Sequence, residues 1–226
     1  MLSFASIRPK TDIDLAFLWS VLALLSIGLV MVYSASVGIA RASAASDFDS
    51  TFYLVRHSIF LVMSVAIAYA AFCVPMEVWQ SLAPKLILFG IVLLVLVLVI
   101  GREINGAQRW IHLPFLNFQP SEIMKLFAVL YTADYCSRRA AHLRSFSSGF
   151  LPLASVMVII ALLIFLEPDF GALVVIISIF MGILFLGGFR AGWFLMLFLT
   201  LAFVFTLMVV FSPYRRERIF GFLNPW

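Results

Sequence analysis

The sequence has little charge for its length. Asp, Glu, Lys and Arg make up only 12% of its 226 residues, whereas 64% are hydrophobic and the mean hydropathy is +1.13. A soluble domain carries about twice that share of charged residues. The composition therefore excludes a soluble globular fold and indicates a membrane protein. The net charge of +4 suits contact with anionic lipid, and it gives no indication of a nucleic acid partner.

The chain is also poor in the residues that build metal centres and common catalytic sites. It has only two Cys and three His, and His57, His112 and His142 follow no metal-ligand spacing. Two cysteines give no disulfide framework, so we take Cys73 and Cys136 as reduced packing residues. No phosphate-binding Gly-rich loop, Walker sequence or Ser-His-Asp set occurs. Nucleotide hydrolysis and triad-type hydrolysis therefore have no support in the sequence.

What the sequence has in abundance is long apolar runs. A helix crosses a bilayer with roughly 17–25 residues, and the runs lack the alternation of a membrane strand, so helices are expected. The prediction is an all-α, polytopic membrane helix bundle that forms one transmembrane domain over residues 1–226. Asp12 and Asp14 precede the first run, which argues against a cleavable signal peptide. Seven spans are expected near residues 15–36, 57–74, 84–100, 120–137, 151–167, 170–187 and 191–211.

Lys and Arg in the short loops indicate the orientation, because cytoplasmic loops carry an excess of both. With the N-terminus in the cytoplasm, seven Lys and Arg residues lie on each side of the membrane once the three arginines of segment 212–226 are placed outside. The basic loop CSRRAAHLRS at 136–145 is the best single cytoplasmic marker. We therefore expect a cytoplasmic N-terminus. This orientation places segment 101–119, the turn at 167–169 and the basic, aromatic segment 212–226 together on the outer face.

A Glu and a Lys lie within the fourth predicted span. Each costs about 2.5–3.5 kcal/mol at the centre of a membrane helix on insertion scales. Glu122 and Lys125 are spaced i, i+3, so they share a helix face and can pair. One interpretation is structural, with Gln119 as the N-cap, Pro120 at the first helical position and Glu122 answering the cap. Capping does not explain Lys125, and the alternative is that the pair lines a water-accessible cavity that admits a phosphate-bearing lipid.

Arg109 and Trp110 lie in the segment between the third and fourth spans, after the turn signal Asn105-Gly106. A Trp at a membrane interface is an ordinary anchor, and an exposed Arg is commonly only solvated. A guanidinium beside an indole can also bind a diphosphate head group. Both interpretations stay open at this level.

The sequence LEPDFGA places two carboxylates around Pro168, between the fifth and sixth spans. The structural interpretation is a tight helical hairpin, in which Pro168 ends one helix and Asp169 caps the next. Glu167 and Asp169 could instead recruit a divalent cation, or act as acid and base. Capping is the favoured role.

Six short pieces of the sequence occur together in one known family and in the same order. They are MVYSAS at 31–36, VPMEVWQ at 74–80, GREINGAQRWI at 101–111, FQPSEIMKL at 118–126, EPDFGALVV at 167–175 and YRRERIFGFLNPW at 214–226. With these pieces the chain resembles the SEDS family (shape, elongation, division and sporulation), which includes FtsW, RodA and SpoVE. The second and last pieces resemble the cell-division members more than the elongation members.

The resemblance implies a peptidoglycan glycosyltransferase that polymerises lipid II on the outer face of the bacterial cytoplasmic membrane, at the division septum. It also implies a class B penicillin-binding protein and other membrane proteins of the divisome as partners. No cofactor is assigned from the sequence, and a divalent cation stays open. The family's substrate cavity would be lined by Arg109, Glu122, Lys125 and Arg218. Its structural motifs would include Trp110, Gln119, Pro120, Ser121, Pro168, Asp169 and Gly171.

Members of the family have ten spans, and their catalytic Asp lies in the outer loop after the seventh span, beyond Trp226 here. We therefore expect no catalytic residue within this chain, and Asp169 lies in a different loop. The chain alone is expected to be incomplete for catalysis. Two other functions stay open, a lipid II flippase and a non-catalytic scaffold of the division complex. Access from both faces of the membrane would favour the flippase, and tolerance of substitutions at Glu122 and Lys125 would favour the scaffold.

Overall fold

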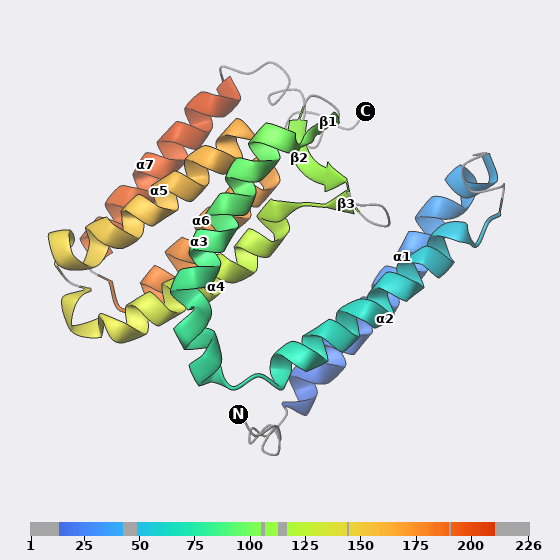
Figure 1. Ribbon diagram of the computed structural model, residues 1–226, viewed down its shortest axis with the longest axis horizontal. Coiled ribbons are helices and arrows are strands. Elements are labelled where there is room, and N and C mark those ends of the chain that lie inside the picture. The colour runs from blue at the N-terminus through green and yellow to red at the C-terminus, as the bar shows by residue number, and fades with distance from the viewer. Residues whose placement is uncertain are drawn as a thin grey trace. The chain divides into compact units, whose positions relative to one another are not determined.

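The described part of the chain consists mostly of seven α-helices, which Figure 1 labels. The computed structural model describes residues 14–42, 49–104, 107–112, 117–143, 145–189 and 191–210. The helices are α1 (Leu15–Ala42), α2 (Phe52–Phe72), α3 (Met76–Ile100), α4 (Pro120–Arg138), α5 (Leu151–Leu166), α6 (Phe170–Leu186) and α7 (Ala191–Val210). The predicted all-α, polytopic membrane helix bundle is confirmed. Among the described residues, Leu15–Ala42, Phe52–Phe72, Met76–Ile100 and Phe146–Leu166 are long and apolar enough to cross a bilayer.

The first three helices extend beyond the apolar runs that predicted them. α3 begins at Met76, eight residues before the predicted span, and continues through Pro84. Glu77 in its first turn is favourable there because of the positive end of the helix dipole. α1 continues to Ala42, with Arg41 in its last turn, where a cation is favourable for the same reason. Apolarity therefore marks the membrane-spanning part of each helix, whereas the backbone continues past it.

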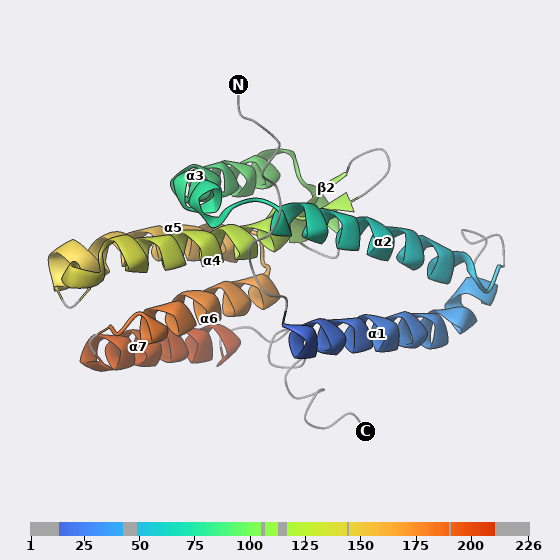
Figure 2. The ribbon, with the colours of Figure 1, turned by 90° about the horizontal axis from the view of Figure 1, so that it is seen from below.

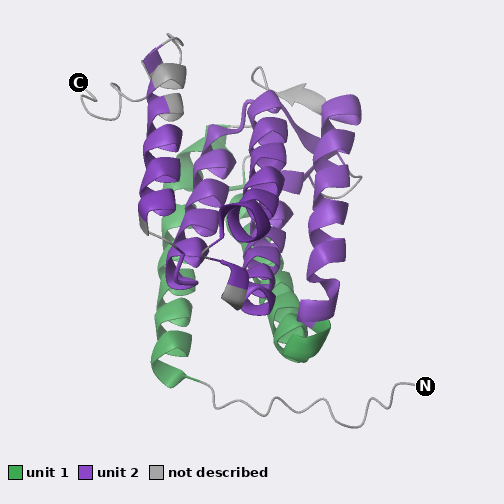
Figure 3. Cartoon of the chain, turned by 90° about the vertical axis from the view of Figure 1, so that its left-hand side faces the viewer, with its two compact units in different colours: residues 1–78 green, residues 79–226 purple. Residues whose placement is uncertain are grey.

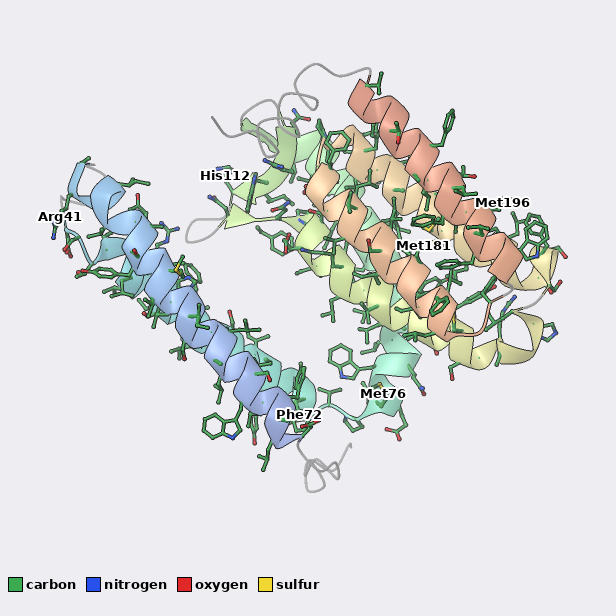
Figure 4. The ribbon with its side chains drawn as sticks, turned by 180° about the vertical axis from the view of Figure 1, so that it is seen from behind. Arg41, Phe72, Met76, His112, Met181 and Met196 are labelled. Atoms are coloured by element: carbon green, nitrogen blue, oxygen red, sulfur yellow. The ribbon has the colours of Figure 1, made fainter. Side chains whose placement is uncertain are left out.

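The chain divides into two compact units, residues 1–78 and 79–226 (Figure 3). In the first unit α1 and α2 lie side by side as a hairpin, with Arg41 at one end and Phe72 at the other (Figure 4). α2 buries none of its described residues and α1 buries only Ala40. Large apolar side chains such as Phe17 and Ile67 are exposed. Exposed apolar side chains on a membrane helix contact lipid, so the exposure does not imply instability.

The second unit is built around α6, which packs against α4, α5 and α7 (Figure 2). Ile176 and Phe180 of α6 are completely buried in its core, as are Met124 of α4 and Ile160 of α5. α3 joins the same core through Leu94. Apolar residues recur on the inward faces at helical spacing, which is why these helices associate with α6.

A small sheet lies between α3 and α4, where the sequence predicted only a turn at Asn105-Gly106. Its strands are β1 (Arg102–Ile104), β2 (Ala107–His112) and β3 (Asn117–Phe118), in the order β1-β2-β3. β1 and β2 pair antiparallel, with Ile104 opposite Ala107. These strands were not predicted. The Asn105-Gly106 signal lies outside the described residues, but an Asn-Gly pair between two short runs is typical of a hairpin, and it could have predicted these strands.

The opposite end of the second unit is closed by hydrogen bonds between α4 and the segment that enters α5. After α4 come a 3-10 helix (η3, Ala140–His142) and a π-helical turn (η4, Phe146–Phe150). Arg138 Nε donates to the buried Asp134 at 2.9 Å, one turn earlier in α4. The hydroxyl of Tyr135 donates to the carbonyl of Gly149 at 2.8 Å. The Tyr135 contact holds the last turns of α4 against the segment that enters α5, whereas the Arg138–Asp134 contact lies within α4.

We expect Gly149→Ala to destabilise this end of the unit. A Cβ at Gly149 would lie 2.1 Å from the backbone carbonyl oxygen of His142, so the backbone must shift. Overpacking of this kind costs typically about 1–3 kcal/mol. Thermal unfolding of the purified protein in detergent should show a lower midpoint for this variant. Gly182→Ala is the control, because nothing lies within 4 Å of a Cβ there; equal midpoints for the two variants would contradict the expectation.

Candidate functional site

Asp169 is the centre of a polar cluster that joins β2, α4 and α6. Its Oδ2 accepts hydrogen bonds from the side-chain amide of Gln119 and, at 3.0 Å, from the hydroxyl of Ser121. The Gln119 amide also donates to Ser121 Oγ at 3.0 Å. The guanidinium of Arg109 lies 3.8 Å from Asp169 Oδ1. We name Arg109, Gln119, Ser121 and Asp169 the Asp169 cluster. It shows that two of the three segments expected on one face, 101–119 and 167–169, do meet.

Asp169 is also the N-cap of α6, as predicted. Its Oδ1 accepts a hydrogen bond from the backbone N–H of Ala172 at 3.3 Å, which satisfies one of the free donors at the helix start. α5 ends at Leu166, two residues before Pro168, as the hairpin interpretation required. A Cβ at Gly171 would meet Asp169 Oδ1 at 3.8 Å, an ordinary contact, so the space around the cap does not require glycine there.

Arg109 lies on β2, where its side chain is 31% exposed. Its Nε is buried and has no hydrogen-bond partner, although its terminal NH1 approaches Asp169. Trp110, the next residue, is half-buried and pairs across the hairpin with Arg102. The guanidinium therefore combines an anionic neighbour with solvent access, which leaves it able to meet a second anion.

Glu122 and Lys125 form the predicted ion pair on α4. Lys125 Nζ lies 2.7 Å from Glu122 Oε2, and the side chains are 27% and 58% exposed, respectively. The pair lies within the first two turns of the helix, next to Ser121, whereas the side chains of the Asp169 cluster make their contacts without it. A pair this exposed contributes roughly 0–1 kcal/mol to stability. Its contribution to the fold is therefore small.

The capping arrangement predicted for the start of α4 is only partly correct. Gln119 is the N-cap residue and Pro120 follows at the first helical position. Gln119 makes no side-chain capping bond, because its amide donates to Asp169 and Ser121 instead. Glu122 turns to Lys125, so the expectation that it answers the cap was wrong. The Gln119 side chain therefore binds the distant carboxylate of Asp169 and does not cap its own helix.

Glu167 is completely buried, and neither of its carboxyl oxygens has a hydrogen-bond partner. It occupies the C-cap position of α5, two residues from Asp169. Burial first, and the nearby charge of Asp169 second, raise the pKa of Glu167 to about 8. The two carboxylates that looked alike in the sequence therefore have different surroundings. Asp169 accepts hydrogen bonds through both oxygens, whereas both oxygens of Glu167 are buried without a partner.

The described residues do not fit the divalent cation that was suggested for Glu167 and Asp169. No three His, Cys, Asp or Glu side chains gather anywhere in the part of the chain that the structure describes. Both Asp169 oxygens already accept hydrogen bonds, and the Arg109 guanidinium 3.8 Å away disfavours a cation there. No chemical step is therefore assigned to a metal.

Two buried carboxylates were not predicted, one at the site and one at the opposite end of the second unit, and one predicted site residue lies outside the described residues. Arg218 and the rest of segment 212–226 fall outside the described range. The complete burial of Glu167 was missed because a turn residue between two spans is usually exposed. The buried Asp134 was missed as well, although an Asp four residues before an Arg on a helix is a recognisable signal.

Comparison with known proteins gives consistent results. The family model for the FtsW/RodA/SpoVE cell cycle proteins matches residues 15–226. A protein of Aromatoleum aromaticum named as a probable peptidoglycan glycosyltransferase FtsW is 48% identical over 217 residues, which cover 95% of this chain and 53% of that protein. A protein of the same name from Burkholderia thailandensis is 45% identical, over 95% of this chain and 47% of that protein.

Solved structures agree with this result. One solved structure is described as showing structural coordination of polymerization and crosslinking by a peptidoglycan synthase complex. A chain from it has 32% identity to this chain and a TM-score of 0.62, over 88% of this chain and 59% of that one. The rod shape determining protein RodA of Thermus thermophilus has 29% identity and a TM-score of 0.60, over 78% and 58% of the two chains.

The chain spans about half the length of the curated relatives that it matches. The similarity nevertheless runs through all of its described helices and through both segments that build the Asp169 cluster. It is a multi-pass membrane protein by the length and apolarity of its helices. The chain belongs to the FtsW/RodA/SpoVE family of cell cycle proteins.

Proposed function

We propose that this chain is part of a peptidoglycan glycosyltransferase that polymerises lipid II during septal wall synthesis in the bacterial cytoplasmic membrane. The proposal rests on one observation above all: Arg109 of the Asp169 cluster and Lys125, four residues after Ser121 on α4, are both partly exposed cations. A diphosphate-linked lipid needs such cations near its leaving group. The names of the relatives that are 45–48% identical to this chain support the same substrate class.

In the reaction, a sugar hydroxyl attacks the anomeric carbon that bears the diphosphate. A C–O bond forms at that carbon, the bond to the diphosphate oxygen breaks, and a base takes the hydroxyl proton. The role that suits Lys125 and Arg109 is to stabilise the negative charge that develops on the departing diphosphate. Arg218 is proposed to join them, since it lies in the basic piece YRRERIFGFLNPW, which is one of those that carry the resemblance to the family.

Neither carboxylate of the turn between α5 and α6 suits the role of the base. Both Asp169 oxygens already accept hydrogen bonds, and its side chain is only 7% exposed. Glu167 is completely buried, so it cannot reach a substrate hydroxyl. We therefore propose that the base is supplied from outside this chain. Arg109, Lys125 and Arg218 form what we name the cationic wall. A class B penicillin-binding protein and other divisome proteins are the proposed partners. The proposed orientation has the Asp169 cluster on the outer face of the membrane and the N-terminus in the cytoplasm.

The test is to place Glu122→Gln and Lys125→Met separately in the full-length gene product and to measure rescue of cells depleted of their own family member. We expect Lys125→Met to abolish rescue while the protein still accumulates and still recruits its division partners, because the ion pair contributes little to the fold. Glu77→Gln and Lys85→Met, both exposed on α3, are matched controls that should rescue.

Each alternative outcome has a separate meaning. Rescue by both site variants would favour the scaffold function and contradict lipid handling. Loss of rescue with an intact rate of glycan polymerisation from supplied lipid II would favour the flippase. Loss of both rescue and polymerisation, with recruitment retained, is the result that the proposal predicts.

A further inference from the structure

Two arginines lie at the end of α4 that is farthest from the Asp169 cluster. Arg138 is the last residue of the helix and Arg139 follows it, and both are exposed, the side chain of Arg138 to 57%. Residues 126–166 include three arginines and a single acidic residue, Asp134. The side chain of Asp134 is only 4% exposed. The exposed charge at this end of α4 is therefore positive, and the one nearby anion lies inside.

Both guanidinium groups are held in place by other parts of the second unit. Nε and one terminal nitrogen of Arg138 donate to the two carboxylate oxygens of Asp134, Nε at 2.9 Å. Arg139 donates to the carbonyl of Ser148 in η4 at 3.0 Å, and its guanidinium lies 5.3 Å from the centre of the Tyr135 ring. The remaining nitrogens of both groups make no hydrogen bond to residues that the structure describes. An arginine that is already oriented loses little side-chain entropy when it binds an anion.

Aromatic side chains beside the two arginines indicate the depth at which they lie. The ring of Phe146 lies 4.6 Å from that of Trp193 and 5.5 Å from that of Phe150, which in turn lies 5.5 Å from Phe189. Phe146 and Phe150 begin and end η4, which also contains Ser148. The end of α4, the start of α5, the end of α6 and the start of α7 therefore meet here (Figure 2). Aromatic residues at the ends of membrane helices lie at the level of the lipid head groups.

We propose that Arg138 and Arg139 bind the phosphate of an anionic phospholipid head group, beside Phe146 and Trp193. An anionic lipid presents its phosphate at this depth, and fixed guanidinium groups are suited to phosphate oxygens. Asp134 offsets part of the charge of Arg138, so Arg139 supplies the larger share of the attraction. The site is separate from the cationic wall and does not depend on the proposed reaction. In the proposed orientation it faces the cytoplasmic leaflet.

A structural role for the two arginines is the alternative. A cation in the last turn of a helix is favourable because of the helix dipole, with or without a lipid. Arg41 has that position in α1, where it is exposed as well. It therefore provides a matched control, since Arg41→Gln removes one exposed cation from a helix end at no cost to the proposed site.

The experiment measures binding of phosphatidylglycerol to the purified protein in a neutral detergent by native mass spectrometry. Phosphatidylcholine, which has the same phosphate but no net charge, is the comparison lipid. We expect the wild type and Arg41→Gln to bind phosphatidylglycerol equally, and Arg139→Gln to bind it about fivefold more weakly. The double variant Asp134→Asn/Arg138→Gln removes the ion pair without changing the net charge, and it should weaken binding by less than Arg139→Gln does. If the double variant does not fold, Arg139→Gln decides alone.

Three results would overturn the proposal. Equal affinity of Arg139→Gln and Arg41→Gln for phosphatidylglycerol would leave the arginines with a structural role. Equal affinity of the wild type for the two lipids would show that the charge of the lipid has no effect. Displacement of the lipid by an equal concentration of inorganic phosphate, or of a polyglutamate peptide, would show that the occupant is a free anion or an acidic protein segment. None of these results bears on lipid II polymerisation, and loss of that activity would leave this test intact.

Discussion

Asp169→Ala is expected to destabilise the second unit more than any other single change at the site. The substitution removes the acceptor for the side chains of Gln119 and Ser121 and for the backbone N–H of Ala172 in the first turn of α6. A buried donor left without a partner costs about 1–3 kcal/mol, and loss of a helix cap adds about 1 kcal/mol. Arg109 also loses its anionic neighbour. The combined loss should lower the midpoint of thermal unfolding by about 5–10 °C.

Asp14→Ala is the matched control for this prediction. Asp14 caps α1 through hydrogen bonds from the backbone N–H groups of Ala16 and Phe17, at 2.9 and 3.1 Å, and it is exposed. Its loss removes a cap and nothing else, so the midpoint should fall only slightly. If Asp169→Ala costs no more than Asp14→Ala, then Asp169 is only a cap, and the cluster does not hold the elements together.

Exchange of the two charges on α4 is the second prediction with a large expected effect. The double variant Glu122→Lys/Lys125→Glu keeps the ion pair, the spacing and the net charge, but it moves the cation one turn toward the start of the helix. Because the pair is partly exposed, the free energy of unfolding should change by less than about 1 kcal/mol. A substrate diphosphate, however, would meet a carboxylate where it needs an ammonium. We therefore expect the full-length gene product with this exchange to lose rescue completely.

The exchange distinguishes charge neutralisation from substrate binding by Lys125, which single substitutions cannot distinguish. If the pair serves only to neutralise charge at membrane depth, the exchanged pair does so equally well and the cells divide. If Lys125 binds the substrate, restoring the pair in the reverse order does not restore function. Protein level and the unfolding midpoint, measured alongside, exclude misfolding as the cause of a loss.

The helices were predictable from the sequence because apolarity in a membrane protein is set by the bilayer and not by tertiary contacts. The run that became α5, for example, has no charge, and Pro168 marks where it stops. The ends were less predictable. α3 starts at Met76 and passes through Pro84, because a helix continues wherever its backbone N–H and C=O groups can form hydrogen bonds within the helix.

The site was predictable in its residues but not in its connections. Proximity in sequence paired Glu122 with Lys125 correctly, since i, i+3 neighbours on a helix must meet. The same reasoning assigned Gln119 to a local cap, and it failed because the Gln119 side chain extends to Asp169, 50 residues further along the chain, and donates to its carboxylate. The different surroundings of Glu167 and Asp169 depend on which donors reach each carboxylate from other elements, and no local pattern in the turn indicates these donors.

The affinity of the purified protein in lipid nanodiscs for lipid II tests the central claim most directly. Binding needs no catalytic base, so it reports on the cationic wall alone. The account predicts that the wild type binds, and that the charge-exchanged variant binds at least about tenfold more weakly, as expected when a charge-assisted contact of about 1.5–3 kcal/mol is lost. Equal affinities for the two proteins, at equal stability, would contradict the claim that Lys125 binds the substrate.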